Sequence, residues 1–181
     1  MAIGLHGNAI SVADFGAQFG KQVGSSAWRP IAQERIDRFA EATDDFQFVH
    51  VDRERAARET PFGGTIAQRL LTLSMVSTLA EDVMPVSPEL IAAVLVGVDR
   101  IKFLSPVKSG SRIRGVFRLD RATRLSPSKL VIRLQCIVEI ENQAKPALSC
   151  EMSWMLLLDE PPAEAGGPAS ALQPIHEPVQ D

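Results

Sequence analysis

An aspartate and a histidine five residues apart are of the right types to act together on a water molecule. Asp45 and His50 lie in a polar and aromatic stretch between two predicted helices. A carboxylate and an imidazole that converge on one water can orient it, remove a proton and return a proton to a neighbouring atom, because the pKa of histidine lies near the working pH. In a loop, the same two residue types more often form a turn and a solvated surface. The spacing of the pair leaves both interpretations open.

Two glycines just before the next predicted helix add a second chemical element. Gly63 and Gly64 lead into this helix, and the start of a helix presents free backbone N–H groups that suit an oxyanion or a thioester carbonyl oxygen. Together with Asp45 and His50, such a helix start would serve the addition or removal of water beside a carbonyl group. The glycines are equally typical of a simple loop. Ser77, on the same helix, would by itself be a small core residue bonded to its own backbone.

Three segments before residue 85 are predicted to be helical. An amphipathic helix of about three turns follows Pro30, and a short helix over residues 52–58 begins with Asp52 as its N-cap. The third helix runs from Thr65 to about Val83 and is apolar on almost every side, so we expect it to be buried. The first helix has Ala32, Ile36, Phe39, Ala40 and Thr43 on its apolar face and Gln33, Glu34, Arg35, Asp37 and Arg38 elsewhere; the third has Ile66, Leu70, Leu73, Ser77 and Ala80 on one stripe.

Beyond the third helix, apolar and polar residues alternate with the period of a β-strand. Four strands are predicted, over about residues 90–103, 113–119, 130–140 and 148–156, with turn signals at 105–110, 126–128 and 142–146. Helices followed by consecutive long strands indicate an α+β fold with an antiparallel sheet. We expect this sheet to curve around the apolar helix. A sheet of this kind has free edges that often pair with another copy of the chain, so we expect a homodimer.

Length and charge restrict the number of domains and the partners. The chain of 181 residues suits one domain, which we place at residues 1–159, with residues 1–12 loosely attached. Residues 160–181 are rich in Pro and Gly and predict a flexible tail. This tail contains four acidic residues and no Lys or Arg, so it accounts for the formal net charge of −3 and leaves the rest of the chain nearly neutral. Such a balance argues against nucleic acid or an anionic membrane as a partner.

The sequence contains no segment that indicates a membrane or a metal site. No stretch approaches the roughly 20 consecutive apolar residues of a membrane-spanning helix, and the N-terminus does not resemble a signal peptide, so we expect a cytoplasmic protein. Cys136 and Cys150 lie in alternating apolar runs, which predict buried reduced thiols; a disulfide is the less common alternative. His6 and His176 lie in segments that resemble loose ends. His50 is therefore the histidine expected inside the folded domain.

The stretch around the Asp–His pair resembles a known family. It reads TDDFQFVHVD at residues 43–52, and is followed by PFGGTIA at 61–67 and LTLS at 71–74. This pattern is similar to the MaoC-like dehydratases, the (R)-specific enoyl-CoA hydratases, and most of all to their branch related to nodulation protein N. The resemblance extends from about Phe15 to Leu158.

The resemblance implies a fold, a reaction and roles for individual residues. It implies a hot-dog fold, in which a sheet wraps around a central helix, and a dimer with sites at the subunit interface. It also implies reversible syn hydration of a trans-2-enoyl-CoA to a (3R)-hydroxyacyl-CoA, with the acyl-CoA as substrate and without a metal or redox cofactor. Asp45 and His50 match the catalytic pair, and Ser77 matches a residue that orients one of them. Which member of the pair is the base stays open at this point.

One departure from the family pattern concerns the start of the third helix. Where the family reads Ile-Ala-His-Gly, this chain has Gln68 and Arg69 in place of the His and the Gly. The Arg69 side chain can turn away, can stabilise an oxyanion or a phosphate of coenzyme A, or can close the pocket. The remaining candidates are Gly64 beside this oxyanion region, and Gln47 and Phe62 as weaker substrate-binding residues.

Two other functions remain as alternatives to a hydratase. A catalytically degenerate hot-dog protein could bind acyl-CoA or act as the structural partner of an active relative, and Arg69 favours this interpretation. A thioesterase can use the same fold, but its water must be aimed at the carbonyl carbon instead of the β-carbon. The hydratase-type motif argues against a thioesterase.

Overall fold

The computed structural model describes residue 14 and residues 17–159. The expectations for residues 1–12, for His6 and His176 and for the tail at 160–181 lie outside the described residues. The helices are α2 (Gln33–Thr43), α3 (Phe48–Val51), α4 (Arg53–Glu59) and α5 (Arg69–Glu81), and the strands are β1 (Gln22–Ser25), β2 (Arg29–Pro30), β3 (Leu90–Phe103), β4 (Arg112–Ser126), β5 (Lys129–Ile140) and β6 (Leu148–Leu158).

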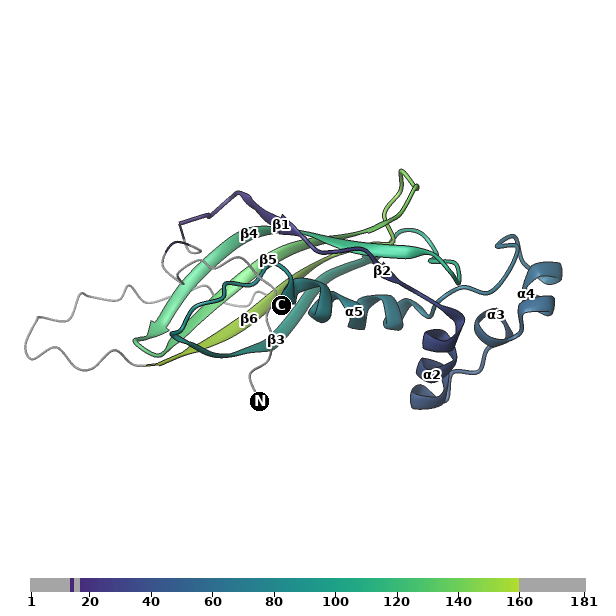
Figure 1. The fold of residues 1–181 in the computed structure, drawn as a ribbon, viewed down its shortest axis with the longest axis horizontal. Helices are drawn as coiled ribbons and strands as arrows, with labels where there is room; N and C mark the ends of the chain where they lie inside the picture. Colours follow the sequence, from purple (N-terminus) through teal and green to yellow (C-terminus); the bar gives the residue numbers. More distant parts are fainter. Residues whose placement is uncertain (1–13, 15–16, 160–181) are drawn as a thin grey trace, which may run out of the picture.

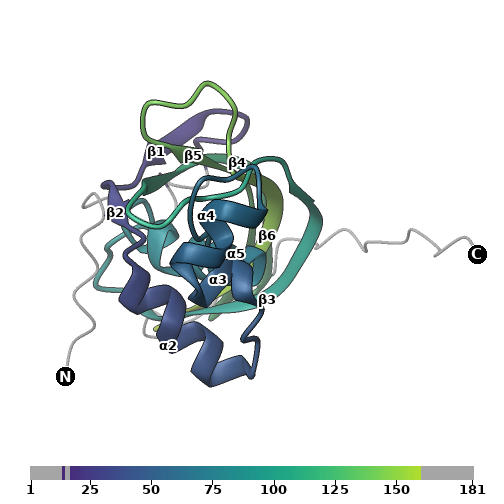
Figure 2. The ribbon, with the colours of Figure 1, turned by 90° about the vertical axis from the view of Figure 1, so that its right-hand side faces the viewer.

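The strands form one antiparallel sheet that curves around a helix. Its order is β1-β4-β5-β6-β3, with the short β2 also paired to β4. Figure 1 shows α5 lying along the sheet, with α2, α3 and α4 beyond one end of it. In the end-on view of Figure 2, the strands surround α5. The predicted α+β class, the antiparallel sheet and the hot-dog arrangement are therefore confirmed.

Strict alternation in the central strands builds the core of the protein. In β5 and β6 every second side chain is buried, and these side chains point toward α5. Burying large apolar side chains is the main stabilising contribution to such a core, about 1.5–3 kcal/mol for each one. The sequence predicted three of the four long strands closely, but it ended β4 too early, since β4 continues to Ser126.

The central helix α5 is shorter than predicted and buries a different face. It begins at Arg69 instead of Thr65, because residues 65–67 are extended and hydrogen-bonded to the segment around Val107. Leu70 was predicted on the inner stripe but is 61% exposed, and Ser77 is only half-buried. The buried positions of the helix are Leu71, Thr72, Met75, Val76, Leu79 and Ala80. Because α5 is apolar on almost every side, the sequence did not indicate which face of the helix is buried.

The edge strand β3 leaves apolar side chains uncovered. It pairs with β6 on one side only, so its other edge has no strand partner in the described part of the chain. Its exposed large apolar residues are Ile91, Val94, Leu95, Val96 and Ile101. A long edge strand with several exposed apolar residues is typical of a surface that pairs with another chain.

The two cysteines face each other inside the sheet. Cys136 of β5 and Cys150 of β6 are directly opposite in the register of the two strands, and both are buried and free. The contact with the Cys150 thiol, together with burial, raises the pKa of the Cys136 thiol. The prediction of buried reduced thiols is confirmed.

Candidate active site

The end of α2 places Asp45 beside the next helix. Asp44 is the C-cap of α2 and adopts a left-handed conformation with φ of 56°. Aspartate tolerates this conformation better than most residues, since its short polar side chain can bond locally. The chain turns sharply after α2, and Asp45 is the first residue beyond this turn. Its side chain is 39% exposed.

A single helical turn, α3, presents His50 to the same region. The His50 side chain is buried, and its Nδ1 lies 2.7 Å from the carbonyl oxygen of Ile66. A backbone carbonyl only accepts hydrogen bonds, so Nδ1 must carry the proton. In the neutral ring, Nε2 is then unprotonated, and it lies 3.8 Å from Oδ2 of Asp45. The expected pair is thus brought together.

Extended backbone between α4 and α5 holds the partner of the imidazole in place. The Ile66 N–H donates to the carbonyl oxygen of Val49, and the Ala67 N–H donates to that of Val107. These bonds attach the segment before α5 to α3 on one side and to the loop after β3 on the other. The carbonyl of Ile66 is therefore fixed, and with it the plane of the His50 ring.

The first turn of α5 offers backbone donors next to this segment. Its N-cap residue, Gln68, makes no side-chain cap bond, and the first helical hydrogen bond runs from the Thr72 N–H to the Gln68 carbonyl. The N–H groups of the first turn thus lack an intrahelical acceptor, as at every helix start. The Gln68 side chain is buried, donates from Nε2 to the Ile36 carbonyl over 3.3 Å, and leaves its Oε1 without a partner in the described structure.

Arg69, the main departure from the family pattern, packs on an aromatic ring. Its guanidinium carbon lies 5.5 Å from the centroid of the Phe103 ring. Arg69 and Phe62 both line a narrow cavity of about 80 Å³, which also reaches Ile66 and Thr72. Arg69 therefore forms part of the wall of a pocket at the start of α5. Phe62, expected as a weaker substrate-binding residue, lines the same pocket.

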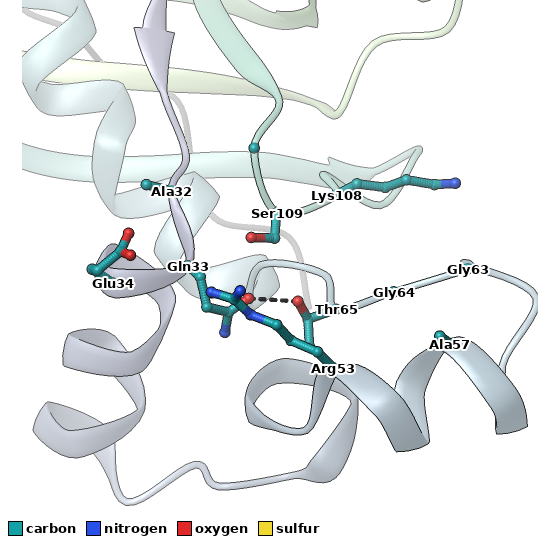
Figure 3. Close-up of a pocket in the computed structure, with 11 residues that line it drawn as sticks. Ala32, Gln33, Glu34, Arg53, Ala57, Gly63, Gly64, Thr65, Lys108 and Ser109 are labelled. Atoms are coloured by element: carbon teal, nitrogen blue, oxygen red, sulfur yellow. Dashed lines mark hydrogen bonds between the residues drawn. The ribbon is translucent and has the colours of Figure 1, made fainter.

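Residues 63–65 line a second, larger cavity. It has a volume of about 440 Å³, and Figure 3 shows Gly64, Thr65, Gln33, Arg53 and Lys108 around it. Gly63 also lines it and has φ of 72°, a conformation that favours glycine. Gly64 thus lies beside this cavity, while Arg69 borders the smaller one.

The side chains of two predicted residues are not hydrogen-bonded to the pair in the part of the chain that the structure describes. Gln47 is exposed and serves as the N-cap of α3, where its carbonyl accepts from the His50 N–H. Ser77 lies eight residues into α5, about 12 Å beyond its start, and none of the hydrogen bonds among the described residues links it to Asp45 or His50.

One residue that the sequence assigned to the polar side of its helix is central to the site. Gln33 is buried, and it bonds to the backbone of His50 and to Thr65. The sequence held a weak signal, because position 33 lies one turn before the buried Ile36 and four residues before Asp37, to which Gln33 also donates.

The described part of the chain shows neither a cluster of metal ligands nor a membrane span. No three His, Cys, Asp or Glu side chains among these residues are grouped so that they could hold a metal ion. None of the described helices is long and apolar enough to cross a membrane.

Comparisons with known proteins show the family and the fold of the chain. Residues 14–135 match the family model described as a MaoC like domain. The chain is 44% identical to nodulation protein N of Rhizobium leguminosarum bv. viciae over 84% of its own length and 94% of that protein. It is 39% identical to 3-hydroxyacyl-thioester dehydratase Z of Mycobacterium tuberculosis, over 78% and 92% of the two chains. The unliganded (R)-hydratase of Pseudomonas aeruginosa has a similar fold, with a TM-score of 0.60, 22% identity and coverage of 86% and 92%.

Proposed function

The chain belongs to the MaoC-like dehydratase family, and from this premise we propose that it is an (R)-specific hydratase that adds water to a trans-2-enoyl-CoA. The observation that carries the proposal is the 3.8 Å approach of His50 Nε2 to Asp45, with Nδ1 of the same ring held by Ile66. A relative at 39% identity is a 3-hydroxyacyl-thioester dehydratase, which supports the reaction class.

The orientation of the imidazole supports an assignment of the roles that the sequence left open. A water between the two side chains can donate one hydrogen to Nε2 of His50 and the other to the Asp45 carboxylate. His50 is then the base: as the water oxygen bonds to C3 of the substrate, the proton passes to Nε2. The π electrons of the C2–C3 double bond move toward the thioester, and Nε2 returns the proton to C2. One nitrogen handles the proton in both directions, so OH and H add to the same face, as in a syn addition.

The start of α5 supplies stabilisation for the charge that develops on the thioester oxygen. The first-turn N–H groups, beginning with that of Arg69, have no acceptor within the helix. Donors of this kind, aimed at a developing enolate oxygen, typically contribute 10²–10³ in rate, or about 2.7–4 kcal/mol. The step moves one proton and no electrons between redox partners, so it requires no redox cofactor, and we propose that it proceeds without a metal.

We also infer that the protein works as a homodimer joined through β3. This strand lies at the sheet edge and carries five of the exposed large apolar residues described in the fold. Pairing of two β3 edges would cover these residues and would continue the sheet into the second copy.

A catalytically degenerate acyl-CoA-binding protein is the second candidate, favoured by one observation. Arg69 borders the narrow cavity at the start of α5, where the family has glycine. If its side chain blocks the acyl group, the pair would be present without turnover.

Hydration assays separate these two functions. Crotonyl-CoA and longer trans-2-enoyl-CoAs lose the absorbance of the conjugated thioester when water adds, and the product's configuration can be tested with an (R)-specific dehydrogenase. We expect turnover by the wild type, and a loss of about 10²–10⁴-fold in the Asp45→Asn and His50→Ala variants. Asp44→Asn is the matched control, because Asn also tolerates the left-handed conformation of residue 44. Turnover by the Arg69→Gly variant, with none by the wild type, would instead establish that the wild-type protein is catalytically degenerate.

A further inference from the structure

A buried glutamine connects the two segments that hold the catalytic imidazole. Gln33 is the first residue of α2 and is only 5% exposed. Its Nε2 donates to the carbonyl oxygen of His50 over 2.7 Å and to Oδ1 of Asp37 over 2.8 Å. Its Oε1 accepts from the hydroxyl of Thr65, a bond that Figure 3 draws between the facing side chains of the two residues.

The partners decide which end of the amide is which. The His50 carbonyl can only accept, so the Gln33 atom that faces it must be the nitrogen. The Thr65 hydroxyl can donate, so it suits the oxygen. Both amide hydrogens and the oxygen are therefore used, and no other common side chain of this size can donate twice and accept once here.

These bonds fix both attachments of the His50 ring. One end of Gln33 holds the backbone of His50 itself. The other end holds Thr65, which precedes Ile66, and the Ile66 carbonyl is the acceptor of His50 Nδ1–H. A shift of the His50 backbone or of Thr65 would lengthen the hydrogen bond from His50 Nδ1 to the Ile66 carbonyl. The proton would then no longer favour Nδ1 over Nε2.

We propose that Gln33 is a positioning residue, which keeps Nε2 of His50 unprotonated and directed toward Asp45. It acts through His50 and Thr65, to which its side chain is hydrogen-bonded. This inference rests on the proposed hydratase function, but its structural part, the protonation of one ring nitrogen, can be observed without any substrate.

Three variants test the role. Gln33→Glu has the same size but replaces two donors with an acceptor that faces the carbonyl of His50. Gln33→Met has a similar size and no hydrogen bonds, and Thr65→Val removes only the hydroxyl donor. Gln135→Met is the matched control, because Gln135 also donates an amide hydrogen bond, to Asp120, but on the outer face of the sheet.

The first readout is the ¹⁵N NMR spectrum of the histidine ring nitrogens in the free protein, with His50 assigned from a His50→Ala variant. In the wild type and in Gln135→Met, we expect the shifts of a ring protonated at Nδ1. In Gln33→Glu and Gln33→Met, we expect shifts that are averaged toward the other tautomer, and in Thr65→Val a smaller change in the same direction. Unchanged shifts in all three folded variants would overturn the proposal.

The second readout is the split between kcat and KM on a trans-2-enoyl-CoA, corrected for the folded fraction from thermal unfolding. A misplaced base lowers the rate of the chemical step, so we expect kcat to fall about 10–100-fold in Gln33→Glu while KM changes little. A loss of activity that only follows the loss of folded protein would mean a structural role and would contradict the proposal. If the wild type has no turnover, the proposed function fails, and the NMR result still decides whether Gln33 sets the tautomer.

Discussion

His50 Nε2 and Asp45 Oδ2 lie 3.8 Å apart, which is too far for a direct hydrogen bond and close enough for one water to bond to both. Under the proposed function, the pair acts on a shared water instead of on each other. The two side chains would then form one catalytic unit.

A double-variant cycle tests whether the pair is one unit. We expect the Asp45→Asn/His50→Ala variant to lose about as much kcat as the more severe single variant, because a water that has lost its base gains nothing from the remaining carboxylate. The rates of all four proteins on crotonyl-CoA give the result. Losses that multiply across the two sites would show that the residues act independently.

The contact of Arg69 with Phe103 predicts a limit on acyl chain length. The Arg69 side chain forms part of the wall of the 80 Å³ cavity, so Arg69→Ala should widen it. We expect kcat/KM to rise for eight- and ten-carbon enoyl-CoAs relative to crotonyl-CoA, since each additional buried methylene stabilises binding by about 0.8 kcal/mol. Arg114→Ala is the control, because Arg114 packs in the same way on Trp28, at a distance of 4.7 Å. An unchanged chain-length preference would show that Arg69 does not border the acyl group.

The uncovered edge of β3 predicts a dimer that a charge can break. Val96→Lys places an ammonium group among the apolar residues of the edge, and lysine on an edge strand prevents pairing. We expect the variant to elute as a monomer in size-exclusion chromatography with light scattering. Leu125→Lys, an exposed apolar position on β4, should leave the wild-type mass unchanged. A wild type that is itself monomeric would contradict the dimer.

The fold and the approach of Asp45 to His50 could be predicted for different reasons. Alternation in β5 and β6 is a local signal, since each residue's face follows from its position in the strand. The approach of Asp45 and His50 was expected from the resemblance to the family. The residue pattern alone did not predict it, because the turn at Asp44 and the carbonyl of Ile66 are what bring the two side chains together.

Other features depended on contacts that no periodicity contains. Gln33 reads as a polar surface residue, yet partners 17 and 32 positions away make its burial favourable. Likewise, α5 begins four residues late because Ala67 bonds to Val107, a residue 40 positions further along the chain.

The thiol of Cys136 is expected to be unreactive in the folded protein. Because the pKa of Cys136 is raised and thiolate is the reactive form, alkylation of Cys136 by iodoacetamide at pH 8 should be slower by at least about 100-fold than in the denatured chain. The contact with Cys136 lowers the pKa of the Cys150 thiol, so this thiol is protected by its burial alone. Mass spectrometry after timed quenching counts the labelled cysteines. Rapid labelling of the native protein would show that this part of the sheet opens.

Gly115 of β4 lies where an added side chain would meet both the sheet and the central helix. A Cβ added there would lie 2.5 Å from Cε2 of the buried Phe117 ring and 3.2 Å from Cβ of Leu79 on α5. Since both neighbours are fully buried, we expect Gly115→Ala to lower the free energy of unfolding by about 1–3 kcal/mol, and to lower Tm by about 2–4 °C for each kcal/mol. The control is Gly97→Ala, where an added Cβ meets nothing closer than 3.9 Å. Urea titration and thermal unfolding of both variants give the comparison, and equal stabilities would mean that the helix can move away from the sheet without cost.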